Sequence, residues 1–294
     1  MLCVSLQRTI TRSLARDSGL STMLLSLTAV AFLVGVSQIG EPSVPGWVSP
    51  MTIAMSLVLM AVFISAERRV RRPLFASPAL RSRLFATSNG ANLLVNLSMM
   101  GAVILLPVYL QDLRGLGAAQ TGMLMLPQIG GWLSATIVCG VMISHSGRVR
   151  PYCLFGTLLT AVGLVMLSTL SADTPYVLMA VFFLGFGIGQ GFALQGLLVA
   201  SQSGIETSEM GKATGFVSFN KSVGSVLGVA LSGVGLNVLQ RQGLDLEDAF
   251  GLTMLAAAPL ALLAFVLCFL MPSLHLDRGP ITVDATESAD PLTV

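Results

Sequence analysis

Asparagines inside a long apolar run are the first residues in this sequence whose type and spacing could do chemistry. Asn92 and Asn96, with Asn89 before them, lie three and four residues apart, so on a helix they share one face. Inside a bilayer, a polar face of this kind points toward protein or toward a wet cavity. For Asn92 and Asn96 two interpretations stay open, contact with a ligand or hydrogen bonds between helices. For Asn89, near the end of the run, the second is favoured.

Two further apolar runs carry amides, and one of them also carries an aromatic ring. Gln128 and Trp132 are four residues apart beside Pro127, and a ring with an amide one turn away would suit a lipophilic aromatic molecule. Helix packing is the alternative for this pair. Gln190 and Gln195 are further candidates for lining a cavity. Their run is rich in glycine, which favours close helix packing over a nucleotide-binding loop because no strand precedes it. These glycines are Gly185, Gly187, Gly189, Gly191 and Gly196.

Lys221 is the one basic residue inside an apolar run. An unpaired lysine at the centre of a bilayer costs about 2.5–3.5 kcal/mol, so we expect its ammonium to reach the membrane interface or to meet a carbonyl or an acid. The chain has four cysteines without a C-x-x-C motif and two histidines, and no nucleophile has a neighbouring base. The sequence therefore predicts no metal site, no cofactor and no enzymatic activity.

Composition places these residues in a membrane. Of the 294 residues, 54% are hydrophobic and 10% are charged, and the mean hydropathy is +0.83, whereas soluble domains carry about 25% charged residues. Eight apolar runs have about the 18 residues or more that cross a hydrocarbon core of about 30 Å. We predict an all-α polytopic membrane protein. Its spans lie at about 22–39, 48–66, 86–110, 120–144, 152–171, 176–200, 212–238 and 250–271.

Basic residues between these spans gather on alternate loops. With the N-terminus inside, Arg114 and Arg241 are the only two on the outer side, while Arg148, Arg150 and the arginines of 66–83 lie on the cytoplasmic side. This asymmetry follows the positive-inside rule and predicts that both termini are cytoplasmic, in a plasma or inner membrane. The run AERRVRRPLFASPALRSR at 66–83 is a topological anchor in this interpretation. Nucleic acid is not an expected partner, because a loop of about 20 residues between spans offers no folded basic surface.

Five segments follow from this pattern of spans and charges. We expect a cationic amphipathic segment at 1–21, a pair of spans at 22–66, a basic cytoplasmic loop at 67–85, a bundle of six spans at 86–272 and a disordered cytoplasmic tail at 273–294. The arrangement is therefore two spans followed by six.

Motifs in the six-span part resemble one family of transporters. The chain resembles the second half of the EmrB/QacA-type drug:proton antiporters, which are fourteen-helix members of the major facilitator superfamily. Four stretches carry the resemblance, in the order and spacing of that family. They are LPVYLQDLRGLGAAQTGMLMLPQIGG (106–131), GVMISHSGRVRP (140–151), FLGFGIGQGF (183–192) and GKATGFVSFNKSVGSVLGVALSG (211–233). The pair of spans at 22–66 resembles the helix pair that these antiporters insert between their halves.

The resemblance implies proton-coupled efflux of lipophilic or cationic drugs, by one major-facilitator half bundle. Its implied partners are membrane lipid, a lipophilic small-molecule substrate and an N-terminal six-helix half that this chain lacks. It implies a gating or structural role for Lys221, where the family has an arginine, and for Arg148 and Arg150. Ser144 and His145 stand where the family has Asp and Arg, which weakens the charge relay of that loop. No acid lies deep in a span, so the alternative is a truncated or non-transporting membrane subunit that needs a partner half.

Overall fold

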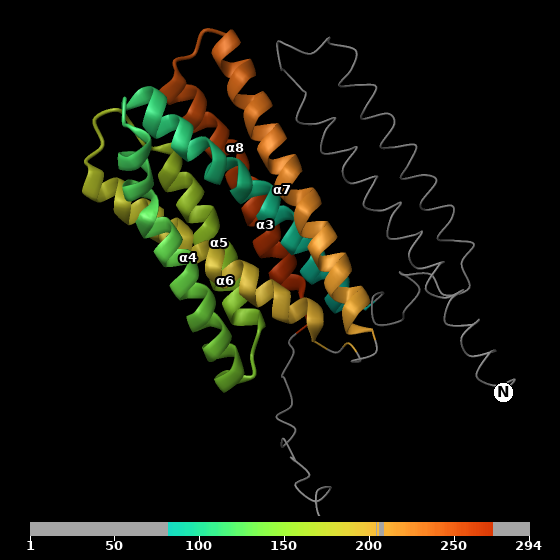
Figure 1. The fold of residues 1–294 in the computed structure, drawn as a ribbon. Coiled ribbons are helices and arrows are strands. Elements are labelled where there is room, and N and C mark those ends of the chain that lie inside the picture. The colour runs from blue at the N-terminus through green and yellow to red at the C-terminus, as the bar shows by residue number, and fades with distance from the viewer. Residues whose placement is uncertain (1–81, 204, 206–208, 273–294) are drawn as a thin grey trace, which may run out of the picture.

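The computed structural model describes residues 82–272, apart from residues 204 and 206–208, and the regular elements of this part are all helical (Figure 1). The segments predicted at 1–21, 22–66 and 273–294, and most of the basic loop at 67–85, lie outside the described residues. The elements are α3 (Arg83–Val108), the π-helical turn η1 (Tyr109–Leu113), α4 (Ala118–Ser146), α5 (Arg150–Ser168), α6 (Tyr176–Gln202), α7 (Met210–Arg241) and α8 (Leu246–Leu270).

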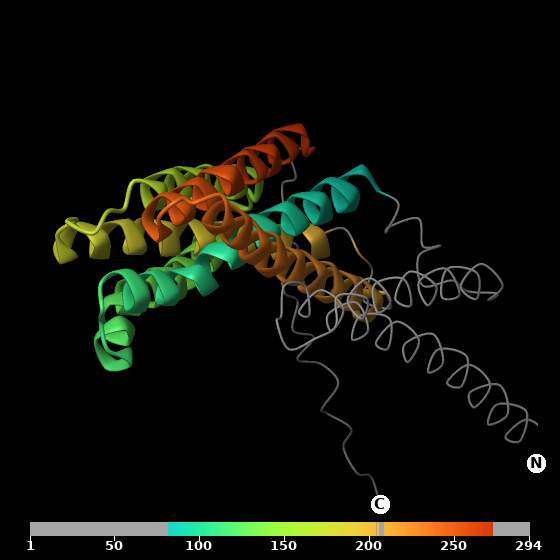
Figure 2. The same ribbon diagram turned by 90° about the horizontal axis from the view of Figure 1, so that it is seen from above.

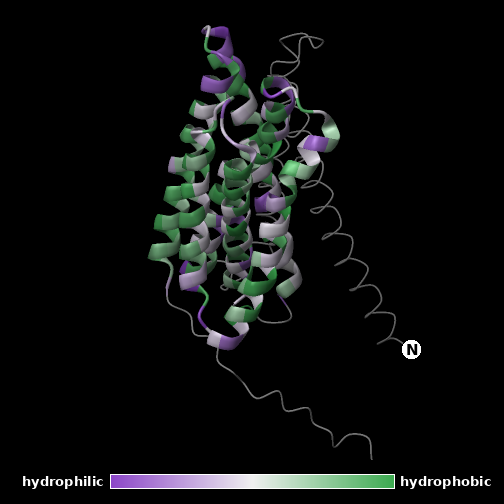
Figure 3. Ribbon diagram, turned by 90° about the vertical axis from the view of Figure 1, so that its left-hand side faces the viewer, coloured by the Kyte–Doolittle hydropathy of each residue, from purple (hydrophilic) through white to green (hydrophobic). Residues whose placement is uncertain are grey.

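Each of the six long helices has the length and apolar composition needed to cross a bilayer. The shortest, α5, has 19 residues, which at 1.5 Å per residue gives about 28 Å. Hydrophobic residues fill most of the middle of the bundle, and hydrophilic residues gather toward its two ends (Figure 3). The six spans predicted between residues 86 and 271 are therefore confirmed, with boundaries shifted by a few residues.

Helix ends follow local signals in the sequence. Ser82 caps the start of α3, where its side-chain oxygen accepts a hydrogen bond of 3.2 Å from the backbone N–H of Phe85. Gly147 ends α4 in the left-handed conformation, with φ of 66°, which a residue with a side chain rarely adopts. Pro151 stands in the first turn of α5, where a backbone N–H has no partner within the helix and is not missed.

The six helices form two groups of three, with α3 and α6 at the centre. α6 packs against α4 and α5, while α3 packs against α7 and α8. Exchanging α3, α4 and α5 for α6, α7 and α8 converts the α4–α6 contact into the α7–α3 contact, and the α5–α6 contact into the α8–α3 contact. The α3–α6 and α5–α8 contacts map onto themselves. The two repeat units are therefore α3–α5 and α6–α8, and each contributes one helix to the centre of the bundle. This is the three-plus-three repeat of a transporter half, with α4 and α7 on opposite flanks (Figures 1 and 2).

Glycines on α6 let the neighbouring helices approach at backbone distance. A Cβ atom on Gly187 would lie 2.2 Å from the carbonyl oxygen of Gln128, and one on Gly191 would lie 2.6 Å from the carbonyl oxygen of Trp132. On its other side α6 packs on α5, where a Cβ atom on Gly189 would lie 2.6 Å from a backbone nitrogen. The predicted close packing is confirmed for these glycines, because only a residue without a side chain fits such gaps.

Glycines on α7 allow the same close packing against α3. A Cβ atom on Gly224 would lie 2.6 Å from the carbonyl oxygen of Leu93, and one on Gly228 would lie 2.3 Å from that of Leu97. Both glycine pairs, one on α6 and one on α7, are four residues apart and face one helix each. The two flanking contacts of the bundle are thus built by equivalent means.

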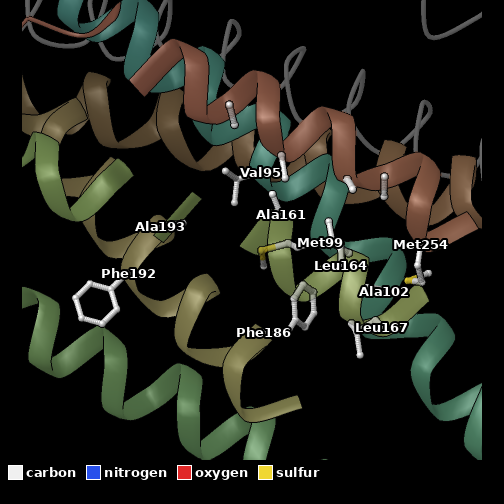
Figure 4. Close-up of a cluster of buried hydrophobic side chains, with 14 of the residues drawn as sticks. Val95, Met99, Ala102, Ala161, Leu164, Leu167, Phe186, Phe192, Ala193 and Met254 are labelled. Atoms are coloured by element: carbon white, nitrogen blue, oxygen red, sulfur yellow. The ribbon is translucent and has the colours of Figure 1, made fainter. Parts of the chain in front are cut away.

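Apolar side chains of α3, α5, α6 and α8 fill the space behind these contacts. Met99 of α3 and Phe186 of α6 lie beside Leu164 of α5 in the buried cluster (Figure 4). Tyr109 is also buried, and its ring centre lies 4.5 Å from that of Phe250 on α8. Because lipid tails are as apolar as these side chains, van der Waals packing is the main stabilising term here.

Candidate functional site

The asparagines of α3 form a hydrogen-bonded seam with α7. The side-chain nitrogen Nδ2 of Asn96 donates to the backbone oxygen of Asn92 at 2.8 Å and to its Oδ1 at 2.9 Å. From the facing helix, Oγ of Ser225 donates to Oδ1 of Asn96 at 3.4 Å. Asn92 is 4% exposed and Asn96 is fully buried. The seam joins the two helices, and a substrate contact by either asparagine stays a prediction.

The seam continues toward the start of α3. Nδ2 of Asn220 on α7 donates to the backbone oxygen of Asn89 at 2.6 Å, and Oγ of Ser201 on α6 donates to Oγ of Ser88 at 3.1 Å. The side chain of Asn89 donates within its own helix instead, to the carbonyl of Phe85. We predicted that the side chain of Asn89 makes a hydrogen bond between helices. In the structure the backbone oxygen of Asn89 makes that bond instead.

Gln128 on α4 and Gln190 on α6 each have an amide atom without such a partner. Gln128 and Gln190 are each 4% exposed. Oε1 of Gln128 and Nε2 of Gln190 are buried, and neither has a hydrogen-bond partner among the described residues. An unpartnered amide atom in a buried position costs about 1–3 kcal/mol. One residue on α4 and one on α6 therefore have unused capacity for hydrogen bonding.

Trp132 is the exposed member of this group. Its ring is 41% exposed, one turn after Gln128, while its backbone packs on Gly191 of α6. Gln195 is half-buried and lies four residues after Gly191, so it faces α4, where its Nε2 would lie 3.7 Å from a Cβ atom on Gly140. Gln128, Trp132 and Gln190 thus lie within about one turn of each other along the helices, and Gln195 lies further toward the end of α4.

Lys221 lies on the other flank of the bundle. Its side chain is exposed on α7, away from the contact between α4 and α6. That its ammonium reaches the membrane interface stays a prediction, as does its role in gating.

Arg150 links two helices at the end of the bundle where α5 begins. Its Nη2 donates to the backbone carbonyl of Phe269 near the end of α8, and its guanidinium carbon lies 5.2 Å from the centre of the Phe269 ring. A cation in this place is stabilised by the carbonyls at the end of a helix and by the ring. Arg148 is exposed, and its backbone N–H donates to Oγ of Ser146 at 3.3 Å. Arg150 therefore has a structural contact, whereas a role for the Arg148 side chain stays a prediction.

Arg114 makes the corresponding link at the opposite end, and sequence reasoning missed it. Its Nη2 donates to the carbonyls of Thr174 and Ser171, the latter at 3.2 Å, and its guanidinium lies 5.3 Å from the ring centre of Tyr176. This contact ties the turn after η1 to the connection between α5 and α6. Because the accepting carbonyls lie 57 and 60 residues further along the chain, no local signal marked Arg114 as more than a loop charge.

Comparison with known proteins agrees with this architecture. The profile described as Major Facilitator Superfamily matches residues 18–229, well over half of the chain. The chain belongs to the Major Facilitator Superfamily. This is a superfamily of transporters, and the six long helices of the described part have the length and apolar composition that a multi-pass membrane protein needs.

Several relatives in the superfamily have names that refer to drugs. The chain is 26% identical over 232 residues to the multidrug transporter protein MdtP of Bacillus subtilis, covering 79% of this chain and 42% of that protein. It is 27% identical over 238 residues to multidrug resistance protein 3 of Bacillus subtilis, covering 79% and 44%. A tetracycline resistance determinant of Streptomyces rimosus is 27% identical over 190 residues, covering 63% and 55%. The chain thus spans about half or less of the length of these relatives.

Proposed function

We propose that this chain is the second half of a fourteen-helix drug:proton antiporter of the EmrB/QacA type, exporting lipophilic or cationic compounds. One observation carries the proposal. The described helices make up one complete three-plus-three half, and the multidrug relatives it matches are more than twice as long as the matched part. A second six-helix half is therefore the expected partner, and the two halves would rock about a site near the middle of the membrane.

In this proposal the proton carrier belongs to the missing half. Proton coupling needs a titratable group inside the membrane. In the part of the chain that the structure describes, every acid lies at a helix end or in a connection. These acids are Asp112, Asp173, Glu209, Asp245, Glu247 and Asp248. The half described here would bind substrate and move with its partner.

Charge at the two ends of the bundle supports one orientation. The end where α3, α5 and α7 begin carries Arg83, Arg148 and Arg150, with Glu209 as its described acid. The other end carries Arg114 and Arg241 together with the remaining described acids. By the positive-inside rule the first end is cytoplasmic. Together with the two spans predicted at 22–66, this orientation would put the N-terminus in the cytoplasm. The membrane would be a plasma or inner membrane.

Labelling in intact cells tests this orientation. The cysteines in the described helices are buried, and Cys3 would be replaced by serine. A cysteine added at an exposed helix end is then the one that the reagent labels. We expect a membrane-impermeant maleimide to label Arg241→Cys in intact cells and Arg148→Cys only after permeabilisation. The reverse pattern would invert the topology and contradict the proposal.

On this half, the substrate site would lie at the contact between α4 and α6. Trp132 offers a flat apolar face for stacking, and Gln128 and Gln190 offer hydrogen bonds beside it. Asn92 and Asn96 would hold α3 to α7 and could line the neighbouring wall. Gln195 and Lys221 lie outside this group, so we propose no direct substrate contact for them.

Efflux measurements test the assignment of the site. In cells that produce this chain joined to a matching N-terminal half, Trp132→Ala should lower export of a lipophilic aromatic dye about three- to tenfold, because the stacking face is lost. Trp132→Phe keeps a ring and should retain most of the export. Ile137→Ala, on an exposed part of α4, serves as a matched control. If Trp132→Ala and Asn96→Ala both left the rate and selectivity of efflux unchanged, the site would be wrongly placed.

A non-transporting membrane subunit is the second candidate function. The absence of an acid within the described spans favours it. The two proposals differ in one measurement, drug export by the chain together with the matching N-terminal half. The first predicts export, and the second predicts none.

A further inference from the structure

Asn96 and the two glutamines, Gln128 and Gln190, differ in whether their side-chain hydrogen bonds are made. Asn96 uses both its nitrogen and its oxygen, in bonds to Asn92 and Ser225. Gln128 and Gln190 are as deeply buried, yet one atom of each amide has no partner among the described residues. Oδ1 of Asn89 on α3 is also buried without a partner among the described residues. A bound ligand is one way to satisfy such an atom, and the two glutamines lie near the level of the exposed Trp132.

The two glutamines lie within one helical turn of each other along the bundle, near the level of the exposed Trp132. Gly187 packs on the backbone of Gln128, and one turn later Gly191 packs on the backbone of Trp132. Gln190 directly precedes Gly191, so it lies between the level of Gln128 and that of Trp132. A molecule stacked on the exposed Trp132 ring would therefore have both amides within about one helical turn.

We propose that this site recognises an uncharged polar group, such as an amide, a carbonyl or a hydroxyl, attached to a lipophilic aromatic body. The inference rests on the proposed function and names the class of substrate that this half selects. A glutamine amide both donates and accepts hydrogen bonds, so the pair complements a group that does the same. None of the described acids lies at this level, so a cation would lose its hydration without gaining a counter-charge.

The melting temperature of leucine variants shows whether Gln128 and Gln190 serve ligand binding or the packing of the fold. If Gln128 and Gln190 served the fold, replacing them with leucine would lower the melting temperature together with the affinity for ligand. If they serve a ligand, leucine removes an unsatisfied buried group, and the free protein keeps or gains thermal stability. The affinity for a polar ligand still falls.

Equilibrium dialysis of the 294-residue chain in lipid nanodiscs tests the proposal, with binding to empty nanodiscs subtracted. Three radiolabelled probes share a naphthalene ring and nearly the same shape: 2-naphthamide, its hydrocarbon isostere 2-isopropenylnaphthalene and the cation 2-naphthamidine. We expect the amide to bind most tightly. Gln128→Leu and Gln190→Leu should each weaken its binding roughly tenfold and leave the hydrocarbon within about twofold. Gln240→Leu, on the exposed end of α7, should change neither.

Three results would overturn the proposal. They are an amide that fails to bind the unmodified chain, a cation that binds more tightly than the amide, and leucine variants that weaken all probes equally while lowering the melting temperature. Dialysis needs no second half and no proton gradient. Failure of this inference therefore shows in the probe series, and failure of the proposed function shows in the flux measurement alone.

Discussion

Gly187→Ala should unfold the contact between α4 and α6. Its Cβ atom would lie 2.2 Å from the carbonyl oxygen of Gln128 and 3.0 Å from the carbonyl carbon, and a helix backbone cannot move aside as a side chain can. Overpacking of this kind lowers the free energy of unfolding by about 1–3 kcal/mol, and a backbone contact of 2.2 Å puts this site at the upper end. We expect a large loss of folded monomer in size-exclusion chromatography and an unfolding transition shifted to much lower SDS concentration.

Gly185→Ala is the matched control, two residues earlier on the same helix. No described atom beyond its chain neighbours and its own helix backbone lies within 4 Å of a Cβ at Gly185. Alanine is a better helix former than glycine, so this variant should be more stable by about 0.5–1 kcal/mol. Opposite signs at the two positions would establish Gly187 as a backbone contact. Equal, small effects would mean that α4 does not lie on α6 as described.

This contact also matters for function. α4 packs almost entirely on α6, so the glycines at the contact fix where Trp132 and Gln128 stand relative to Gln190. In the proposed function this half would move as one body, and backbone-to-backbone packing would supply that rigidity without long side chains that change rotamer. Loss of Gly187 should therefore abolish substrate binding together with the fold.

Much of this fold could be predicted from the sequence, because the signals involved are local. A run of about 20 apolar residues has few alternatives to a spanning helix, since lipid satisfies no backbone hydrogen bond. The close packing of most α6 glycines was also predictable, because the absence of a preceding strand removed the nucleotide-loop alternative. The prediction was wrong for Gly185, where a Cβ atom would meet no described atom within 4 Å. The prediction of six spans in the described part succeeded for these reasons.

The site was less predictable, because its character depends on partners distant in the sequence. Asn96 and Gln128 are both amides in apolar runs, and nothing local shows that one is satisfied by Ser225 and the other is not. Gln190 and Gln195 were both candidates for lining a cavity, yet five residues on a helix turn their side chains to different faces, and that of Gln195 reaches α4 near Gly140. Arg114 was missed because its accepting carbonyls belong to the connection between α5 and α6.

The second large effect concerns transport by the chain alone. We expect the purified 294-residue chain to catalyse no proton-coupled flux, because no acid lies within the described spans and, in the proposed function, the other part of the site belongs to a second six-helix half. Supplying a matching N-terminal six-helix half should convert this zero rate into measurable export. The change is all-or-none, since neither half has both the proton carrier and a complete substrate site.

Proteoliposomes give the direct measurement of this central claim. The chain is reconstituted alone and together with the N-terminal half, an inward or outward pH gradient is imposed, and movement of a lipophilic aromatic dye is followed with and without an uncoupler. The account predicts uncoupler-sensitive flux for the pair, with the chain alone equal to empty liposomes. Robust antiport by the chain alone, or no flux by a folded and assembled pair, would contradict it.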